Sequence, residues 1–562
     1  MSRIINNKKF LISIVVTFIL TVGLWRICPL MFQNNDDKFL LYMMAGYTTG
    51  SPAMTTIFGG FLWAGIVCLF YKIYAGLTWY TVLTLVVLII SVATMCRSFI
   101  VTESKRDLVT GLLAFVLVFV SVLAYFMSAI QYTVTAAYMG AAAVCALIIA
   151  GRMSDKRYRI AYEVLSVVLI VLSFSIRKQM GLVTMSAVGI TLFFMIFSEQ
   201  RRYAIKMLII ACGFFVIVYA SNAIYEKATG LDEFNEYYDV VQRWIDYPHL
   251  DIAEDTDGVY ASVGWDDELY AAAEEWFFMD DRVNTESIQT INEATAEIQL
   301  TTDEIITRAL DAITNKQMVN IQVIMWLIVV VLANVIAISK KSNLAQVLGV
   351  DAMFVLFLLV VFYFCFMQGR FPLRVYQALV IIYFVPTVAI LIGMLRDSKL
   401  YTVVPWLIGV GIILIAVTYK VYPAGSMLYQ LKLATHDSDR QEMISQVTEL
   451  EEYASAHTDH VYIYDYELSQ PSDIFVNFGE NMPYNILFWG GWTYNSPVYY
   501  QQLAANGLES ISSEDLVDGD IYLCGTYVDE TIQAYMESQF GDIEVEIVDQ
   551  VDDILIYRYV SK

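Results

Sequence analysis

Residues 79–98, WYTVLTLVVLIISVATMCRS, contain no charged side chain before Arg97. About 17–25 apolar residues are needed for a helix to cross the hydrocarbon core of a bilayer. Runs of this length recur along the 562-residue chain, which is 58% hydrophobic and only 16% charged. The sequence therefore predicts a polytopic α-helical membrane protein.

Twelve apolar segments are candidate membrane spans, near residues 10–30, 53–71, 79–98, 108–130, 132–150, 160–176, 179–198, 203–224, 317–339, 344–368, 371–395 and 400–422. Cytoplasmic loops carry an excess of Lys and Arg. If 53–71 lies along the outer surface, the cytoplasmic loops hold 14 basic residues and the short outer loops hold five. If 53–71 crosses, the 14 basic residues lie outside and the five lie inside, which conflicts with the cytoplasmic position expected of the basic N-terminus. Charge therefore favours eleven spans, a cytoplasmic N-terminus and an extracytoplasmic C-terminus.

The net charge of −23 is concentrated in two regions. Residues 226–316 carry 23 acidic and five basic side chains, and residues 423–562 carry 25 acidic and four basic side chains. These regions hold −18 and −21, so the remaining chain is +16. Nucleic acid is excluded as a partner because phosphate binding needs basic patches. The two acidic regions are expected to be folded units on one side of the membrane.

The acidic regions differ in their predicted secondary structure. Residues 226–316 are expected to form a helical outer insert, with helices at 268–279 and 286–299 and a capping box at 301–304. The tail from 423 alternates helices with strand-like runs, which predicts an α/β domain. The expected organisation is a membrane domain over 1–422, including a first outer loop at 31–78 and the insert, followed by an extracytoplasmic α/β domain over 423–562.

The seven cysteines show no spacing typical of a zinc site, and only four histidines are present. Most of the cysteines lie in apolar segments and are expected to be unpaired. A Cys28–Cys524 bridge on the outer face is the alternative.

The first outer loop contains Asn34-Asn35-Asp36-Asp37, followed by a short amphipathic stretch at 38–48. We predict that Asp36 and Asp37 are catalytic: one carboxylate takes a proton from an acceptor hydroxyl and the other orients it. The same pair could hold a divalent cation, Mg²⁺ or Mn²⁺. The alternative is structural, because acidic residues also complement the dipole at the start of a helix.

Basic side chains stand where spans meet the outer surface, which the positive-inside bias normally depletes. Guanidinium groups at this depth suit bidentate binding of a lipid phosphate, although snorkelling toward headgroups also explains them. The candidate donor-phosphate residues are Arg177, Lys178, Arg370 and Arg374.

Aromatic and acidic residues alternate in the insert and could hold a sugar by stacking and hydrogen bonding, or could simply pack a small domain. The candidate substrate-binding residues are Arg243, Asp246, Trp265, Asp266 and Asp267. In the tail, residues 488–492 read Phe-Trp-Gly-Gly-Trp, which predicts either a sugar-facing loop or a contact between domain and membrane.

Together these features resemble the GT-C superfamily of membrane glycosyltransferases, which includes protein mannosyltransferases, aminoarabinose transferases and the oligosaccharyltransferase catalytic subunit. These enzymes carry an acidic pair in the first outer loop, as Asp36-Asp37 does here, together with surface-lying helices, as 38–48 and 53–71 would be. The chain has no Trp-Trp-Asp signature of the oligosaccharide-transferring branch, and its insert at 226–316 matches nothing in the general pattern.

The resemblance implies an integral membrane glycosyltransferase of the hexosyl- or pentosyltransferase class. The donor would be a polyprenyl-phosphate sugar, and the acceptor an envelope glycan, lipid or protein on the outer face. Transfer would invert the sugar, with Asp36 or Asp37 as base and the arginines stabilising the departing phosphate. A transporter or flippase of lipid-linked glycans is one alternative, although no internal repeat is visible. A non-catalytic protein that binds envelope polymer is the other.

Overall fold

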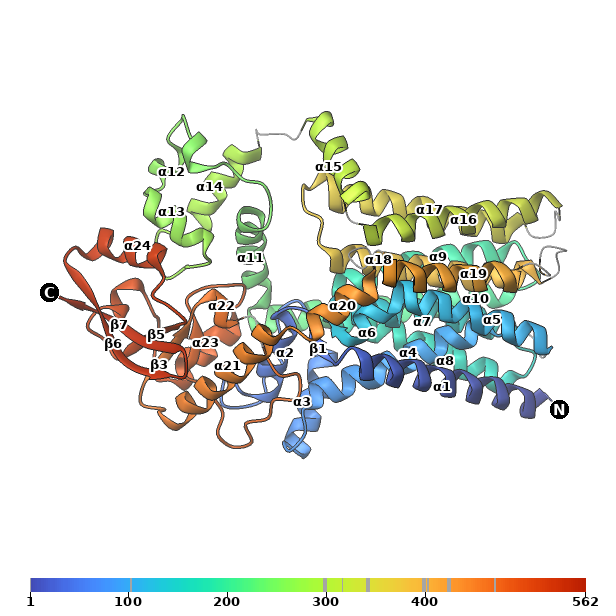
Figure 1. Ribbon diagram of the computed structural model, residues 1–562, viewed down its shortest axis with the longest axis horizontal. Helices are drawn as coiled ribbons and strands as arrows, with labels where there is room; N and C mark the ends of the chain where they lie inside the picture. The colour runs from blue at the N-terminus through green and yellow to red at the C-terminus, as the bar shows by residue number, and fades with distance from the viewer. Residues whose placement is uncertain are drawn as a thin grey trace.

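A computed structural model gives the arrangement of the chain, and Figure 1 shows a helical bundle at one end and two smaller units at the other. The structure describes residues 2–101, 104–296, 301–315, 317–339, 344–396, 401, 404–421, 426–469 and 472–562. The predicted domain boundary between 422 and 423 lies outside the described residues.

Within the described residues, ten helices are long and apolar enough to cross a membrane. They match ten of the eleven predicted spans, so the chain is a multi-pass membrane protein. Their bounds are α1 Ser2–Ile27, α4 Trp79–Phe99, α5 Lys105–Val118 with η1 Phe119–Leu123 and α6 Ala124–Ser128, α7 Tyr132–Gly151, α8 Lys156–Ile176, α9 Lys178–Ile196, α10 Arg201–Thr229, α16 Gln317–Ser339, α17 Leu344–Val361 with η4 Phe362–Met367, and α18 Leu373–Leu395. The eleventh predicted segment forms α19 Val404–Val421, a shorter apolar helix.

The bundle is centred on α7 and α18, which are 94% and 89% buried over their apolar windows. Alanine and glycine dominate the middle of α7, and a Cβ at Gly140 would overlap the side chain of Thr184 on α9. Small residues let helix backbones approach closely inside a membrane. The ends of α7 and α18 are therefore held in fixed positions, and both contribute to the site described below.

The first loop begins with β1 Met31–Phe32, which pairs in parallel with β2 Ala129–Ile130 just before α7. The predicted helix at 38–48 is α2 Asp36–Ala45, and Gly46 ends it in the left-handed conformation that glycine tolerates. The segment 53–71 forms α3 Phe61–Ile73. Its 13 residues span about 20 Å, which is less than the roughly 30 Å hydrocarbon core. In Figure 1, α3 runs across the direction of the bundle helices.

The insert is helical, as predicted. Its elements are α11 Leu231–Ile245, η2 Ile252–Glu254, α12 Val259–Ser262, α13 Asp267–Glu274, α14 Thr285–Ala296 and α15 Thr302–Asn315. The predicted capping box is present, because the Thr301 N–H donates to Glu304 Oε2 and the Glu304 N–H donates to Thr301 Oγ1. Helix α11 was not predicted, although its apolar residues recur at helical spacing.

The tail contains a five-stranded sheet in the order β4-β3-β5-β7-β6. Strands β3, β4 and β5 are parallel to one another, and β7 is antiparallel to both β5 and β6. The tail therefore alternates helices and strands, as predicted, although the three-residue β4 was not expected. The elements are α20 Met427–Thr435, α21 Ser438–Ala456, β3 Val461–Tyr464, α22 Tyr466–Ser469, β4 Ile486–Phe488, α23 Pro497–Ala505, η7 Ser513–Leu516, β5 Ile521–Gly525, α24 Glu530–Phe540, β6 Ile543–Val551 and β7 Ile554–Ser561.

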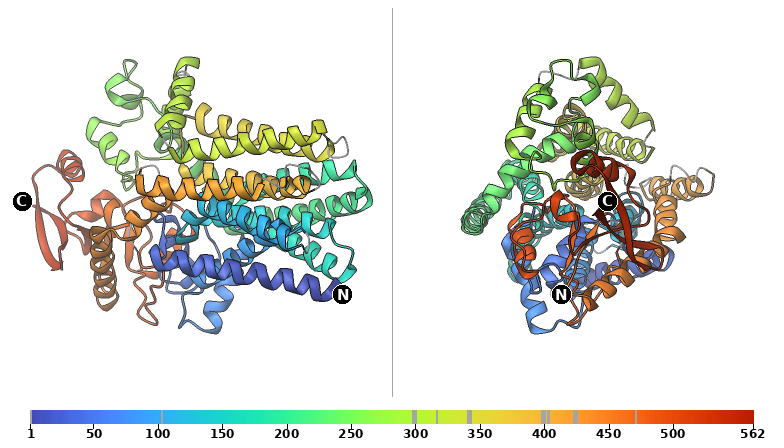
Figure 2. Two further views of the ribbon diagram at one scale, coloured as in Figure 1. Left: turned by 45° about the vertical axis from the view of Figure 1, so that its right-hand side comes forward. Right: turned by 90° about the vertical axis from the view of Figure 1, so that its left-hand side faces the viewer.

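The insert and the tail share one hydrophobic core, in which Trp244 and Ile288 pack in the same cluster as Ile463 and Tyr535. Figure 2 shows the insert and tail together over one end of the bundle. Cys28 and Cys524 are both buried and unbonded, so the alternative of a disulfide between them is wrong.

Candidate active site

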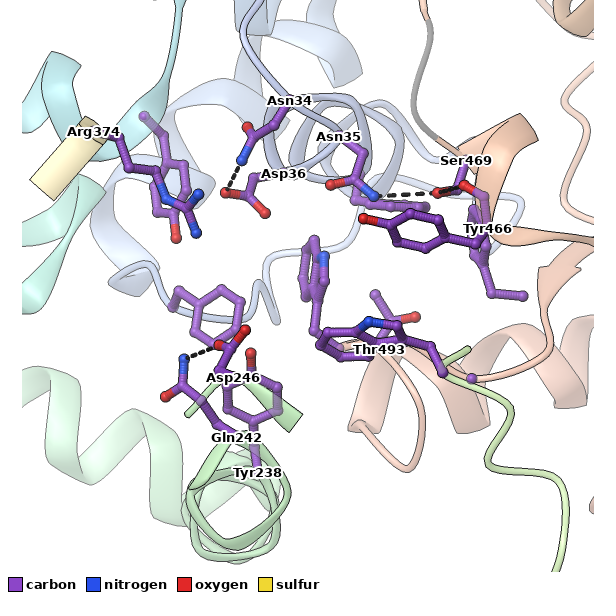
Figure 3. A pocket seen from close by; sticks show the side chains of 18 of the residues that line it. Asn34, Asn35, Asp36, Tyr238, Gln242, Asp246, Arg374, Tyr466, Ser469 and Thr493 are labelled. Atoms are coloured by element: carbon purple, nitrogen blue, oxygen red, sulfur yellow. Dashed lines mark hydrogen bonds between the residues drawn. The ribbon is translucent and has the colours of Figure 1, made fainter. Parts of the chain in front are cut away.

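A cavity of about 260 Å³ lies where the bundle, the insert and the tail meet. Figure 3 shows it enclosed by side chains from all three parts of the chain. Its lining residues are Asn34, Asn35, Asp36, Phe39, Phe58, Tyr132, Arg177, Tyr238, Gln242, Asp246, Trp276, Arg370, Arg374, Tyr466, Ser469, Phe488, Trp489, Gly490, Gly491, Trp492 and Thr493.

Asp36 is the acidic residue of the pair that reaches this cavity. It opens α2, and the β1–β2 pairing brings it beside the start of α7. Its Oδ2 accepts hydrogen bonds from Asn34 Nδ2 at 2.7 Å and from Gln131 Nε2 at 3.3 Å. No described residue donates to Oδ1. One oxygen is therefore oriented by the protein, and the other is free to accept a proton or a hydrogen bond.

Asp37 is fully buried and does not line the cavity. Its Oδ1 accepts from the Tyr80 hydroxyl at 2.6 Å, and its Oδ2 accepts from the Tyr132 N–H at 3.0 Å, at the first turn of α7. Burial raises the pKa of Asp37 to about 8, and adjacent Asp36 adds to the rise, against the hydrogen bonds from Tyr80 and Tyr132. The two hydrogen bonds fix the start of α2 against the bundle, and burial favours the protonated form of Asp37.

Three of the four predicted phosphate-binding residues line the same cavity as Asp36. Arg177 donates to the Tyr132 hydroxyl at 2.7 Å and lies over the Phe58 ring at 5.0 Å. Arg374 makes no hydrogen bond or ion pair with the described residues, and Figure 3 shows its guanidinium extending toward Asp36. Lys178 lies outside the cavity lining and forms an ion pair with Glu226 on α10.

Arg370 is already paired. Its Nη1 lies 2.6 Å from Asp246 Oδ2, and that oxygen also accepts from Gln242 Nε2 at 3.0 Å. Asp246 therefore joins the cavity as the partner of an arginine. Its charge is largely compensated, which leaves Asp36 as the acid in the lining without a cationic partner at ion-pair distance.

The other predicted substrate-binding residues lie outside the cavity lining. Trp265 is buried in the core shared by insert and tail, with its indole N–H bonded to the Arg282 carbonyl. Asp266 caps α13 through the Leu269 N–H and pairs with Arg282, and Asp267 follows in the first turn of that helix. Arg243 lies over the Tyr247 ring at 5.5 Å. For Trp265 and Asp266, the structure shows the packing role that the sequence left as the alternative.

Several cavity residues were missed from the sequence. Tyr238 and Gln242 come from α11, whose apolar spacing of three and four residues could have revealed a helix. Trp276, Tyr466 and Ser469 carry no local signal, because only tertiary packing brings them to the cavity. The residues at 488–492 all line it, which favours the interpretation as a loop facing the site.

No family model matches the chain, and no curated protein matches it. Among solved structures, it is similar to ArnT from Cupriavidus metallidurans bound to undecaprenyl phosphate, with 10% identity, a TM-score of 0.40 and coverage of 98% of this chain and 97% of that chain. It is also similar to an Archaeoglobus fulgidus oligosaccharyltransferase in complex with zinc and sulfate, with 10% identity, a TM-score of 0.41 and coverage of 98% and 73%.

These solved structures belong to the GT-C class that the acidic pair and its surroundings resemble. A similarity of this degree carries no assignment of function. The function is therefore inferred from the cavity residues themselves.

The fit of a divalent cation to the acidic pair can be tested on the donor atoms. Among the described residues, no group of three or more His, Cys, Asp or Glu side chains could hold a metal ion. Both oxygens of Asp37 are engaged with protein donors, which leaves Asp36 as the one carboxylate of the pair facing the cavity. The residues present do not fit the predicted two-carboxylate cation site.

Proposed function

We propose that this protein is a membrane glycosyltransferase that moves a sugar from a polyprenyl-phosphate donor to an acceptor hydroxyl at the outer face of the membrane. The observation that carries the proposal is the common cavity of Asp36, Arg177 and Arg374. These residues come from the first loop, the start of α9 and the start of α18, so their meeting is a property of the fold rather than of local sequence.

The arginines provide the phosphate end of the site. Arg374 has no competing protein acceptor among the described residues, and Arg177 is held in place by Tyr132 and Phe58. A guanidinium group binds phosphate through two parallel hydrogen bonds, and its charge favours a developing phosphate anion. Both arginines adjoin the predicted membrane spans, where the phosphate of a lipid-linked donor would lie.

Asp36 provides the base. In the proposed reaction, its free oxygen takes the proton of the acceptor hydroxyl while the acceptor oxygen forms a bond to the anomeric carbon. The bond from that carbon to the phosphate oxygen breaks, and its electron pair leaves with the polyprenyl phosphate beside Arg374 and Arg177. Asp37 holds the start of α2 against α7, so that Asp36 stays oriented by Asn34 and Gln131.

A single displacement inverts the configuration of the sugar. Retention through a glycosyl-enzyme intermediate would need a second uncompensated carboxylate in the site. Asp246 is paired with Arg370, and Asp37 is buried away from the cavity. The arrangement therefore favours inversion.

The outer-face assignment rests on the basic loops and on the position of the acidic units. The insert and tail lie together at one end of the bundle, as expected if both face the same side of the membrane (Figure 1). With the N-terminus cytoplasmic, that side is extracytoplasmic.

The proposal is tested by mass analysis of envelope glycans, lipids and proteins from cells that carry the wild-type chain, no chain, or Asp36→Asn. We expect a sugar-sized mass difference to disappear without the protein, and the Asn variant to lower the transfer rate about 100- to 10,000-fold. Asp267→Asn is the matched control, because this exposed acid lies outside the cavity. Full transfer by a folded Asp36→Asn protein would exclude the mechanism.

A further inference from the structure

The wall of the cavity formed by the insert and the tail is built mainly from aromatic side chains. Tyr466 of α22 is 48% exposed, and Trp276, Phe488 and Trp492 line the cavity beside it. The amide and hydroxyl groups of Asn35 and Ser469 lie along the same wall and are bonded to each other at 3.3 Å (Figure 3). The wall therefore brings aromatic rings and polar side-chain groups together at the cavity.

The tail loop that carries the tryptophans is fixed against the insert. The Phe278 N–H donates to the Trp489 carbonyl at 3.0 Å, and the Gly491 N–H donates to the Trp276 carbonyl at 3.3 Å. A Cβ at Gly490 would overlap the Trp276 carbonyl oxygen, so this position requires glycine. These contacts between the insert and the tail hold Trp276 and Trp492 in place at the cavity.

Two aromatic residues of the lining hold strained backbones. Phe58 has φ +66° and Trp276 has φ +63°, within a set of only five non-glycine residues with positive φ in the described part of the chain. A bulky side chain rarely adopts this conformation, and each case costs on the order of 1–3 kcal/mol. Such strain persists where packing over-determines the position, and it is concentrated at ligand-binding sites.

Trp492 contributes an unused hydrogen-bond donor. Its side chain is 8% exposed and packs edge-to-face on Phe39 at 5.3 Å. Its indole N–H is buried and has no hydrogen-bond partner among the described residues. Buried Trp N–H groups usually find an acceptor, so this residue of the lining carries an unsatisfied donor.

We propose that this aromatic wall, defined by Trp276, Tyr466, Phe488 and Trp492, is a saccharide subsite that binds a neutral pyranose ring of the acceptor, so that the acceptor is a glycan. A pyranose presents an apolar face of C–H groups that stacks on aromatic rings, and a rim of hydroxyls that bonds amides, hydroxyls and indole N–H groups. The wall supplies both kinds of contact, and the arginines that would bind phosphate come from other segments of the lining.

The identification of the bound ring as the acceptor rests on the proposed function. A hydroxyl of a ring stacked on the wall would face the cavity that Asp36 lines. Binding of the ring itself does not depend on transfer, so the two proposals can fail separately.

The test uses the full chain in nanodiscs and a panel of methyl pyranosides of glucose, galactose, mannose and N-acetylglucosamine. Saturation-transfer NMR reports contact with the ring C–H groups, and titration gives the affinity. We expect at least one glycoside to bind, and Tyr466→Ala to weaken it about three- to tenfold. Tyr466→Phe should retain most of the affinity, and Trp492→Phe should lose part of it by removing the N–H donor. A blocked serine or threonine peptide should show no contact.

Tyr527→Ala is the matched control, because Tyr527 is a 52% exposed tail tyrosine outside the cavity. Asp36→Asn separates the two proposals: it should abolish transfer and retain glycoside binding. If no glycoside contacts the protein, or if Tyr466→Ala and Trp492→Phe bind glycosides as the wild type does, the saccharide subsite is overturned. Binding of the peptide with loss in the same variants would also overturn it. Glycoside binding without any transfer by the wild type would overturn the proposed function alone.

Discussion

The same three helices, α7, α9 and α18, end in a cavity at both of their ends. The cavity of about 260 Å³ lies where α7 and α18 begin and Arg177 precedes α9. The other, of about 290 Å³, lies where these helices finish and α17 begins. Volume therefore does not distinguish the two ends. The side chains distinguish the two ends, because three arginines, Asp36 and a wall of aromatic rings converge at the first end.

The polar residues at the second end are arranged differently. Arg152 donates to the backbone carbonyls of Ser98 and Ala389, and Gln200 donates to the carbonyl of Gly151. These hydrogen bonds satisfy backbone carbonyls at helix ends, and among the described lining residues they leave no unpaired cationic side chain comparable to Arg374. The difference indicates that the first cavity is the candidate site because Arg374 and one oxygen of Asp36 have no protein partner among the described residues.

The largest effect on the cavity at the first end is expected when α2 is disconnected from the tail. Lys38 and Glu451 form an ion pair at 3.2 Å with side chains only 1% and 2% exposed, and the Tyr42 hydroxyl also donates to Glu451. Glu451→Gln removes the carboxylate that compensates the buried Lys38 ammonium group, so we expect a loss of stability of about 3–5 kcal/mol. The measurement is the thermal transition of the detergent-solubilised protein.

Two controls define that result. Lys38→Met combined with Glu451→Met should be less destabilised than Glu451→Gln alone, because no unpaired charge remains. Glu546→Gln breaks the exposed pair with Arg558 and should leave the thermal transition nearly unchanged. Equal effects of the buried and exposed substitutions would show that the Lys38–Glu451 pair does not hold α2.

The next effect concerns the charge that sets the two ends apart. We expect Arg374→Ala to lower kcat/KM for transfer about 100-fold, because a preorganised cation at the departing phosphate is lost. Arg374→Lys should recover part of the rate, since an ammonium group supplies charge without the bidentate geometry. A rate within twofold of the wild type for the Ala variant would remove Arg374 from the mechanism.

A smaller effect is expected in the pH dependence of stability. The pKa of Asp37 is 3.8 for the free side chain and about 8 in the folded protein, so the folded state binds more protons between these values. The contribution of Asp37 to stability therefore falls as pH rises from about 4 to 8 and levels off above that. Asp37→Asn, which cannot titrate, should gain thermal stability relative to the wild type as pH rises through this window. A difference independent of pH would contradict the burial of a titrating Asp37.

The smallest effect is expected at the second end. Glu199 is an exposed acid that lines that cavity, and Glu199→Gln matches the chemistry of Asp36→Asn. We expect the transfer rate to stay within about twofold of the wild type, in the same assay. A large loss would show that both ends take part in the reaction and would remove the contrast between them.

The sequence predicted the broad fold because membrane spans and regular strands have local signals. Apolar length located the ten spans, and strand-like runs alternating with helices indicated the α/β tail. Among the elements that were not predicted, α11 has 15 residues but lies in a strongly acidic region, and β4 has only three residues.

The sequence also brought Asp36 and the arginines into one hypothesis, through their common position at the outer ends of spans. It did not separate Asp36 from Asp37, because adjacent residues on α2 differ only in what packs around them. The contacts of Asp37 with Tyr80 and Tyr132 depend on the packing of α4 and α7. Trp276 and Tyr466 reach the cavity through the shared core of insert and tail, which local patterns do not encode.

That shared core also constrains how the protein is made. Residues such as Trp244 and Ile288 are synthesised well before Ile463 and Tyr535, with α16 to α19 inserted in between. At ordinary rates of translation the interval lasts on the order of ten seconds, during which the apolar side of the insert has nothing to pack against. Chains truncated before β3 would keep that surface uncovered permanently, and we expect them to aggregate or be degraded even though every membrane helix is present.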